Sequence, residues 1–104
     1  MRLQSEIKFY ESLFAYRDNR SQFAAGVLAE AYIDIMQDKH ICHVCKGLGV
    51  MIDNLDAMSF TLYKSCPDAV DNIMQAIAKL SVQLADALLA KTVSDAVGDY
   101  VGGY

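Results

Sequence analysis

Proline, positive charge and paired cysteines are all scarce in this 104-residue chain. Thirteen Asp and Glu outnumber nine Lys and Arg, so the net charge is −4. An acidic chain is poorly suited to binding duplexes through phosphate neutralisation, and a basic protein partner suits it better. Direct nucleic-acid binding is therefore not expected, apart from a weak local signal in the basic residues Arg2, Lys8, Arg17 and Arg20.

Long apolar runs are missing from the amino terminus. Charges interrupt the first segment, MRLQSEIKFYE, so neither a signal peptide nor a membrane span is expected there. Three cysteines, an odd number, fit reduced thiols or metal ligands better than a disulfide framework. Together these features predict a cytoplasmic protein with no membrane partner.

Signatures of catalysis are also missing. The sequence has no P-loop, no nucleotide fingerprint and no Ser-His-Asp arrangement. Asp53 and Asp56 share a helix-face spacing, but next to Asn54 and Leu55 they fit the solvated first turn of a helix. We therefore expect a protein that is not an enzyme and has no catalytic residues.

Apolar residues, in contrast, make up 54% of the chain. A chain of this length forms one modest core, so we expect a single helical domain over residues 1–97. The composition provides more apolar side chains than such a core needs, and surplus apolar surface usually lies in an interface. The sequence therefore predicts a protein that binds another macromolecule, with a homodimer as the alternative.

The spacing of the apolar residues predicts an all-α fold, a small bundle of about four helices. The first helix is expected over residues 2–17. A short polar turn follows, and Ser21 is a good N-cap for a second helix that ends near Asp38.

A knuckle is expected between the second and third helices, because residues 40–49, HICHVCKGLG, break the helical pattern with two glycines. The following 50–64 segment fits a helix. A strand is the alternative there, since three apolar residues also alternate, namely Met58, Phe60 and Leu62.

The longest periodic segment begins at the only proline, Pro67, and predicts a helix over residues 67–96. Its apolar residues form a near-heptad seam of Val70, Ile73, Ile77, Leu80, Leu84, Ala87 and Leu88. The shorter helices need something to pack against, which favours a core seam over a dedicated dimer seam. The last residues, 98–104, read GDYVGGY and are expected to form a flexible tail.

A metal site is one candidate function for the knuckle. Cys42 and Cys45 form a CxxC pair, a spacing that lets two thiolates bind one zinc ion at a tight turn. Because the chain has no second CxxC, the remaining ligands would be His40, His43 and Cys66, the last only if the fold returns it to the knuckle. The alternative is reduced, partly buried cysteines beside a glycine turn, with no cofactor.

The run from Cys42 to Gly49 has the form CxxCxGxG. It resembles one unit of DnaJ-type zinc domains and of some lambdoid phage antiterminators. The resemblance covers eight residues and departs from the family pattern, because those domains repeat the unit to collect four thiolates. It implies a zinc-knuckle antitermination or regulatory protein that acts on RNA polymerase or nucleic acid.

The bond between Cys66 and Pro67 is the one peptide bond expected to populate the cis form at appreciable levels. A trans proline at the first helical position is the expectation. A cis bond would make these two residues a conformational site, at which a prolyl isomerase would assist folding.

Apolar and aromatic side chains on the first helix and the tail are the candidate partner contacts. An apolar helix face docks in a groove of its partner, and tyrosines are frequent hot spots in such interfaces. The candidates are Phe9, Tyr10, Leu13, Tyr16, Tyr100 and Tyr104.

The whole chain resembles the small accessory proteins that temperate phages direct against host enzymes, in particular the anti-RecBCD inhibitors of lambdoid Salmonella phages. Its size, acidity, helicity, Cys42–Cys45 knuckle and Ser65-Cys66-Pro67 junction carry this resemblance. The resemblance implies a cytoplasmic protein that binds the RecBCD exonuclease and recombination complex of the host bacterium. By changing or blocking the processing of DNA ends, such a protein protects phage DNA.

Overall fold

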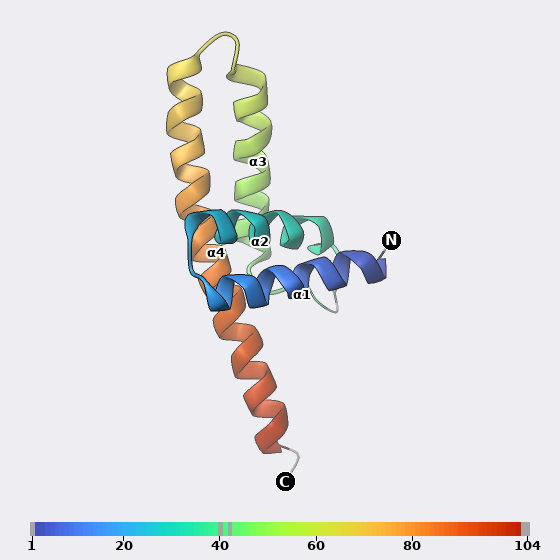
Figure 1. Cartoon of the computed structure of the whole chain (residues 1–104). Helices are drawn as coiled ribbons and strands as arrows, with labels where there is room; N and C mark the ends of the chain where they lie inside the picture. The colour runs from blue at the N-terminus through green and yellow to red at the C-terminus, as the bar shows by residue number, and fades with distance from the viewer. Residues whose placement is uncertain (1, 40, 42, 103–104) are drawn as a thin grey trace.

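The computed structural model of the chain contains four α-helices in the residues that it describes (Figure 1). It describes residues 2–39, 41 and 43–102, and side chains over 4–39, 41 and 43–91. The chain is 83% helical and the described residues contain no strand, which confirms the predicted all-α bundle. The helices are α1 (Arg2–Asp18), α2 (Gln22–Ile35), α3 (Lys46–Leu62) and α4 (Pro67–Gly102).

The helices form two antiparallel hairpins that cross each other. α1 pairs with α2, α3 pairs with α4, and α2 lies across the second hairpin near the middle of α4 (Figure 1). The α3–α4 hairpin therefore projects beyond the layer of α1 and α2, and the end of α4 projects on the opposite side. The molecule is accordingly elongated, with extents of 59 × 27 × 21 Å.

The hydrophobic core lies where α2 crosses α4. Its largest fully buried side chains come from three helices, namely Leu13, Leu28, Tyr32 and Leu84. Burying each of them contributes about 1.5–3 kcal/mol relative to leaving it exposed. The remaining buried apolar residues that the structure describes belong to the same core cluster.

The first two helices begin and end close to the predicted residues. Ser21 is the N-cap of α2, with extended backbone, and its hydroxyl oxygen accepts a hydrogen bond from the Ala24 amide at 3.0 Å. This bond satisfies one of the free amides at the start of the helix, which is why Ser21 is favoured there. The prediction of Ser21 as an N-cap is confirmed.

The knuckle is shorter than predicted. Cys45 has a φ of 59°, in the left-handed region, and α3 begins at the next residue, Lys46. The Gly49 amide already donates to the Cys45 carbonyl at 3.2 Å, so both glycines of the segment are helical. The prediction of a turn through Gly49 is therefore wrong, because Cys45 makes the change of direction that the glycines were expected to make.

Gly49 is needed for a close approach between helices and not for a turn. A Cβ atom at this position would lie 2.9 Å from Met36 Sδ and 3.1 Å from Tyr32 Cε2. The Tyr32 ring is fully buried, and its hydroxyl donates a hydrogen bond to the Val44 carbonyl. The absence of a side chain at Gly49 thus lets α3 pack directly on α2.

The two later helices follow the predicted periodicity. Residues 50–62 are helical, which settles the choice between helix and strand in favour of helix. Besides Gly49, the buried and partly buried side chains of α3 recur at alternating spacings of four and three, namely Leu48, Ile52, Leu55, Ser59 and Leu62. On α4, Leu84 and Leu88 of the predicted seam are buried in the core of this one chain, whereas its other five residues are partly buried. The choice between a core seam and a dimer seam stays a prediction.

Regular structure in α4 continues beyond the predicted end. The helix includes residues 98–102, where the glycine-rich sequence predicted a tail without regular structure. Extending a helix that is already formed fixes the backbone of only one residue for each hydrogen bond gained. Residues 98–102 also contain no proline, which would end the helix. The flexibility of the 98–104 segment stays a prediction.

One segment of α4, Pro67–Lys91, is long and apolar enough to cross a membrane by length and composition alone. Core helices of soluble proteins are also this apolar, but they are mostly buried, whereas 28% of the apolar window in this segment is buried, including Leu84, Leu88 and Leu89. Part of the apolar surface of α4 is therefore buried in the core of this chain. The absence of a membrane partner stays a prediction.

Two glycines of α3 provide a matched test of this packing. We expect Gly49→Ala to lower the free energy of unfolding by about 1 kcal/mol, because Tyr32 has no room to yield. Gly47→Ala, whose Cβ meets nothing within 4 Å, should raise it by about 0.5 kcal/mol through helix propensity. Urea unfolding followed by circular dichroism measures both, and equal effects of the two substitutions would contradict the close approach at Gly49.

Candidate partner-binding surface

The partner contacts predicted on α1 are mostly core residues. Phe9, Leu13 and Tyr16 are each 1–2% exposed, so they do not reach a partner, and their assignment as contacts is wrong. The Phe9 ring lies 6.2 Å from the Tyr32 ring, within the contact between α1 and α2. Tyr10, the fourth predicted contact on this helix, is 40% exposed and remains a candidate.

The exposed side of α1 carries the neighbouring apolar stripe. Ile7, Tyr10 and Phe14 fall three and four residues apart and are all at least 40% exposed. The Arg17 guanidinium lies 4.9 Å from the Phe14 ring centroid and covers part of one face. The helix thus has two apolar sides, of which one faces the core and the other faces solvent.

Tyr16 links α1 to α4 through its hydroxyl. The hydroxyl donates a hydrogen bond of 2.5 Å to Asp86 Oδ1, and Arg20 lies 3.9 Å from the same carboxylate oxygen. Burial first, and then the hydrogen bond to Asp86, raise the pKa of Tyr16 to about 12. The residue therefore acts in the fold, as an anchor between two helices.

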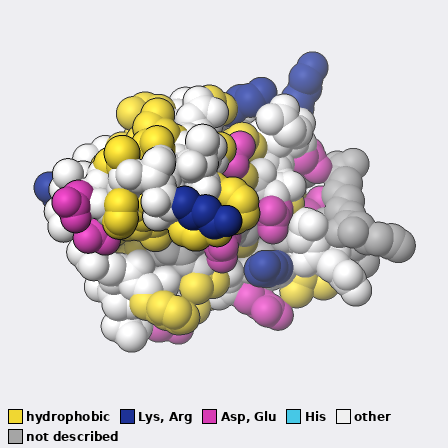
Figure 2. All heavy atoms as spheres, turned by 90° about the horizontal axis from the view of Figure 1, so that it is seen from above, with side chains coloured by type: hydrophobic (Ala, Val, Ile, Leu, Met, Phe, Trp, Pro, Cys, Tyr) yellow, Lys and Arg dark blue, Asp and Glu magenta, His cyan; other side chains and the backbone are white. Residues whose placement is uncertain are grey.

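The tip of the α3–α4 hairpin presents further apolar side chains. Phe60 is 79% exposed and Tyr63 53% exposed, and their ring centroids lie 6.1 Å apart. Figure 2, a view onto the tip, shows apolar side chains in separate patches with acidic and basic side chains between them. Only α3 and α4 pack against each other in this part of the molecule, so their outer faces stay uncovered.

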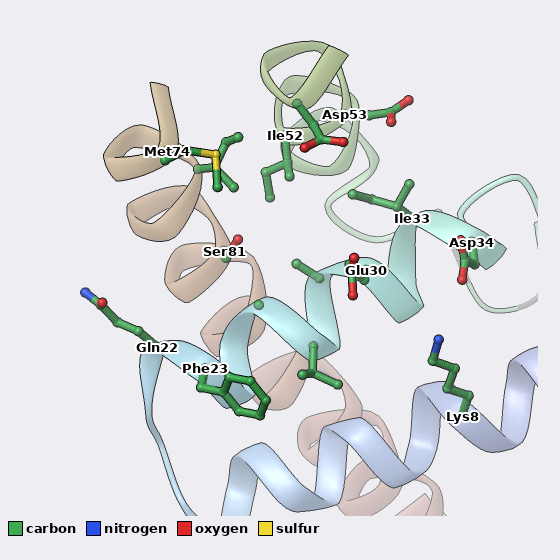
Figure 3. Close-up of a pocket in the computed structure, with 15 residues that line it drawn as sticks. Lys8, Gln22, Phe23, Glu30, Ile33, Asp34, Ile52, Asp53, Met74 and Ser81 are labelled. Atoms are coloured by element: carbon green, nitrogen blue, oxygen red, sulfur yellow. The ribbon is translucent and has the colours of Figure 1, made fainter. Parts of the chain in front are cut away.

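A groove of about 560 Å³ follows the solvent-facing side of α2 next to the α3–α4 hairpin (Figure 3). We call it the α2 groove. α2 supplies its floor, α3 and α4 form one wall, and Lys8 of α1 lies at the other edge. Its lining residues are Lys8, Gln22, Phe23, Gly26, Val27, Ala29, Glu30, Ile33, Asp34, Ile52, Asp53, Asp56, Met74, Ile77 and Ser81.

The α2 groove combines apolar walls with carboxylates. Phe23 is 82% exposed at one end and Met74 is 49% exposed on the hairpin wall. Four exposed carboxylates stand around them against the single cation Lys8, which gives the lining a net charge of −3; they are Glu30, Asp34, Asp53 and Asp56. None of these carboxylates forms an ion pair with another described residue.

Asp53 and Asp56 do not lie in the first turn of a helix, where the sequence predicts them. α3 begins at Lys46, so these two residues lie in its second and third turns. Their spacing of three places both on the side of α3 that faces α2. The spacing of three indicates a shared helix face, but the groove to which both residues contribute is lined by residues of all four helices.

The cysteines predicted as zinc ligands are not all brought together. Cys45 precedes α3 and Cys66 follows it, and a helix of 17 residues separates them by about 25 Å. Two ligands of one zinc ion lie within about 4 Å of each other. Cys66 is therefore excluded as a partner of Cys45 in one tetrahedral site, because α3 carries the chain away from the knuckle.

The rest of the predicted zinc site is only partly described. His40 and Cys42 lie outside the described residues. His43 is exposed, with Nδ1 3.2 Å from the Lys39 carbonyl oxygen, and Cys45 packs against the core with its pKa raised by burial. The described residues contain no group of three His, Cys, Asp or Glu placed to hold a metal, and zinc at the CxxC pair stays a prediction.

The other predicted sites can be placed briefly. The peptide bond between Cys66 and Pro67 is trans, and Pro67 is the first residue of α4, as expected. A prolyl isomerase at this bond stays a prediction. The side chains of Tyr100 and Tyr104 lie outside the described residues, so their role as contacts is open to test.

Comparison with known proteins gives no identity for the chain: no family model matches it, and neither a curated protein nor a solved structure matches it. A function for the chain therefore has to be inferred from its own structure.

The raised pKa of Tyr16 predicts how stability changes in alkaline solution. The unfolded chain releases this phenol proton near pH 10, whereas the folded chain holds it until about pH 12. The stabilisation is complete below pH 10 and is lost as the pH rises to 12. From pH 9 to pH 11 we expect wild type to lose about 1 kcal/mol more than Tyr16→Phe does. Urea unfolding at both values measures the difference, and parallel losses would contradict the buried hydrogen bond to Asp86.

Proposed function

We propose that this protein is a non-enzymatic binding protein that holds another protein against its exposed apolar surface. One observation carries the proposal: ten large apolar side chains among the described residues are 39–82% exposed. They are Ile7, Tyr10, Phe14, Phe23, Val50, Met51, Met58, Phe60, Tyr63 and Met74.

Single exposed apolar side chains are common in soluble proteins and need no explanation. Here they recur on the outer side of α1, along α3 and at its end, and in the α2 groove. Covering a large apolar side chain contributes about 1.5–3 kcal/mol, so a partner that covers only a few of them gains a useful binding energy. Aromatic and Met side chains are also the types enriched at interfaces.

The partner that we propose is a DNA-processing enzyme of a host bacterium, the RecBCD complex. The chain would then be a phage-encoded inhibitor or modulator that acts in the host cytoplasm and protects phage DNA. The size, acidity and helicity of the chain support this, as does its resemblance to the anti-RecBCD inhibitors. The acidic α2 groove supports contact with protein in preference to nucleic acid.

Binding of purified RecBCD by the full-length chain tests the proposal. We expect a complex with a Kd of about 1 μM or tighter, together with slower or altered digestion of linear DNA by the bound enzyme. RNA polymerase, tested in the same binding assay, is the comparison for the zinc-knuckle hypothesis, and it should not bind the chain.

The cysteines provide the control for this experiment. Replacing Cys42 and Cys45 by Ser should leave RecBCD binding within about twofold of wild type, because the proposed contact is apolar. Binding to RNA polymerase that is lost in this variant would favour the zinc regulator. Failure of the wild-type chain to bind RecBCD would overturn the proposal.

A further inference from the structure

We propose that the α2 groove receives a basic amphipathic helix of the partner protein. The apolar side of this helix would lie on Phe23 and Met74, and its Lys and Arg side chains would pair with the carboxylates around the groove. The inference rests on the proposed binding function and specifies the surface and the chemistry that it uses.

The apolar contacts of the groove lie in suitable positions. Phe23 projects from α2 and Met74 from the hairpin wall, so that an occupant lying along α2 would touch both (Figure 3). Both are at least 49% exposed, whereas Ile33 of α2 and Ile77 of α4 are partly buried and add apolar surface to the lining. A flexible thioether such as Met74 adapts to the side chains of an occupant.

The shape of the groove favours a helix as the occupant. Its floor runs along α2 from Gln22 to Asp34, a length of about 20 Å, which matches three to four turns of a second helix. A Cβ atom at Gly26 would meet nothing within 4 Å, so an occupant can approach the backbone of α2 closely at this point. The described residues offer no sheet edge for an extended peptide, and a groove that runs along a helix suits helix-in-groove docking.

The charge of the groove decides which kind of helix fits. Glu30, Asp34, Asp53 and Asp56 come from two helices and are exposed on the groove. None has an ion-pair partner among the described residues, and Lys8 is the only cation in the lining. An acidic occupant would bring like charges together, whereas Lys and Arg flanking an apolar stripe would meet opposite charges.

Binding of two designed peptides to the full-length chain tests the inference. Each is an 18-residue fluorescein-labelled helix with Leu at spacings of three and four, flanked by Lys in one peptide and by Glu in its twin. Fluorescence anisotropy should show that the Lys peptide binds at least about tenfold more tightly than the Glu peptide. Equal affinities for the two peptides would overturn the proposal.

A pair of glycine substitutions locates the binding. Gly26→Gln fills the open space on α2, and Gly47→Gln adds the same side chain to an equally open position of α3 outside the groove. Both should keep the thermal stability of the wild type, because Gln favours helix over Gly. We expect Gly26→Gln to bind the Lys peptide at least tenfold more weakly than the wild type, and Gly47→Gln to bind it within twofold of the wild type. Equal binding by the two variants would place the peptide elsewhere and overturn the proposal.

A charge substitution serves as a second, independent variant. Replacing Asp53 and Asp56 by Lys changes the net charge of the lining from −3 to +1 and should weaken Lys-peptide binding at least about tenfold. Replacing Asp68 and Asp71 by Lys makes the same change of net charge at two exposed positions of α4 outside the groove, and this matched control should change binding much less. Unchanged affinity in the Asp53 and Asp56 variant would overturn the assignment of the groove.

The same variants separate this inference from the proposed function. If RecBCD binds wild type and Gly26→Gln equally, the protein is a RecBCD ligand that does not use the α2 groove, and only the groove proposal fails. If RecBCD does not bind the wild type, the proposed partner is wrong, and the peptide measurements still decide whether the groove accepts a basic helix.

Discussion

The packing of α2 across the middle of α4 is the contact on which the rest of the structure depends. Leu84, Ala85 and Leu88 of α4 are buried there, beneath the fully buried Leu28 and Tyr32 of α2. This crossing is the main link between the two hairpins, because α1 and α3 contact the opposite hairpin less extensively. Removing apolar volume at the crossing would therefore loosen the whole fold and not a local part of it.

The same crossing explains why so much apolar surface remains exposed. α2 has 14 residues and covers only a part of α4, which has 36. Beyond the crossing, α3 and α4 pack only against each other. Two paired helices bury the side chains along one seam and leave their outer faces exposed to solvent. The α2 groove arises at the inner corner of this crossing, where a helix lies against a projecting hairpin. The exposed apolar surface and the α2 groove are thus consequences of how the two hairpins cross.

The sequence predicted the parts of this structure that depend on local pattern. The four helices, the N-cap at Ser21 and the start of α4 at Pro67 follow from periodicity and capping preferences. The side of α1 that faces the core did not follow, because both of its stripes are apolar and aromatic. Contacts with Tyr32 and Asp86, which are distant in sequence, decide between them.

The α2 groove was beyond sequence reasoning for the same reason. Its residues come from all four helices, and Glu30 and Asp53 approach one groove only after the hairpins have crossed. The position of Cys66 at the far end of α3 also depends on the full course of a helix and not on a motif. Local patterns contain the elements of a site, whereas tertiary packing decides which elements meet.

The methionines of the chain provide the most direct measurement of the central claim, that a protein partner covers the α2 groove. Met74 lines the groove, Met51 and Met58 are exposed on α3 outside it, and Met36 is buried in the core. In ¹³C-methyl NMR spectra of the full-length chain, saturation with RecBCD should shift or broaden the Met74 methyl signal selectively, beyond the general broadening of the complex. Changes at Met51 and Met58 with Met74 unaffected, or no change at any methionine, would contradict the account.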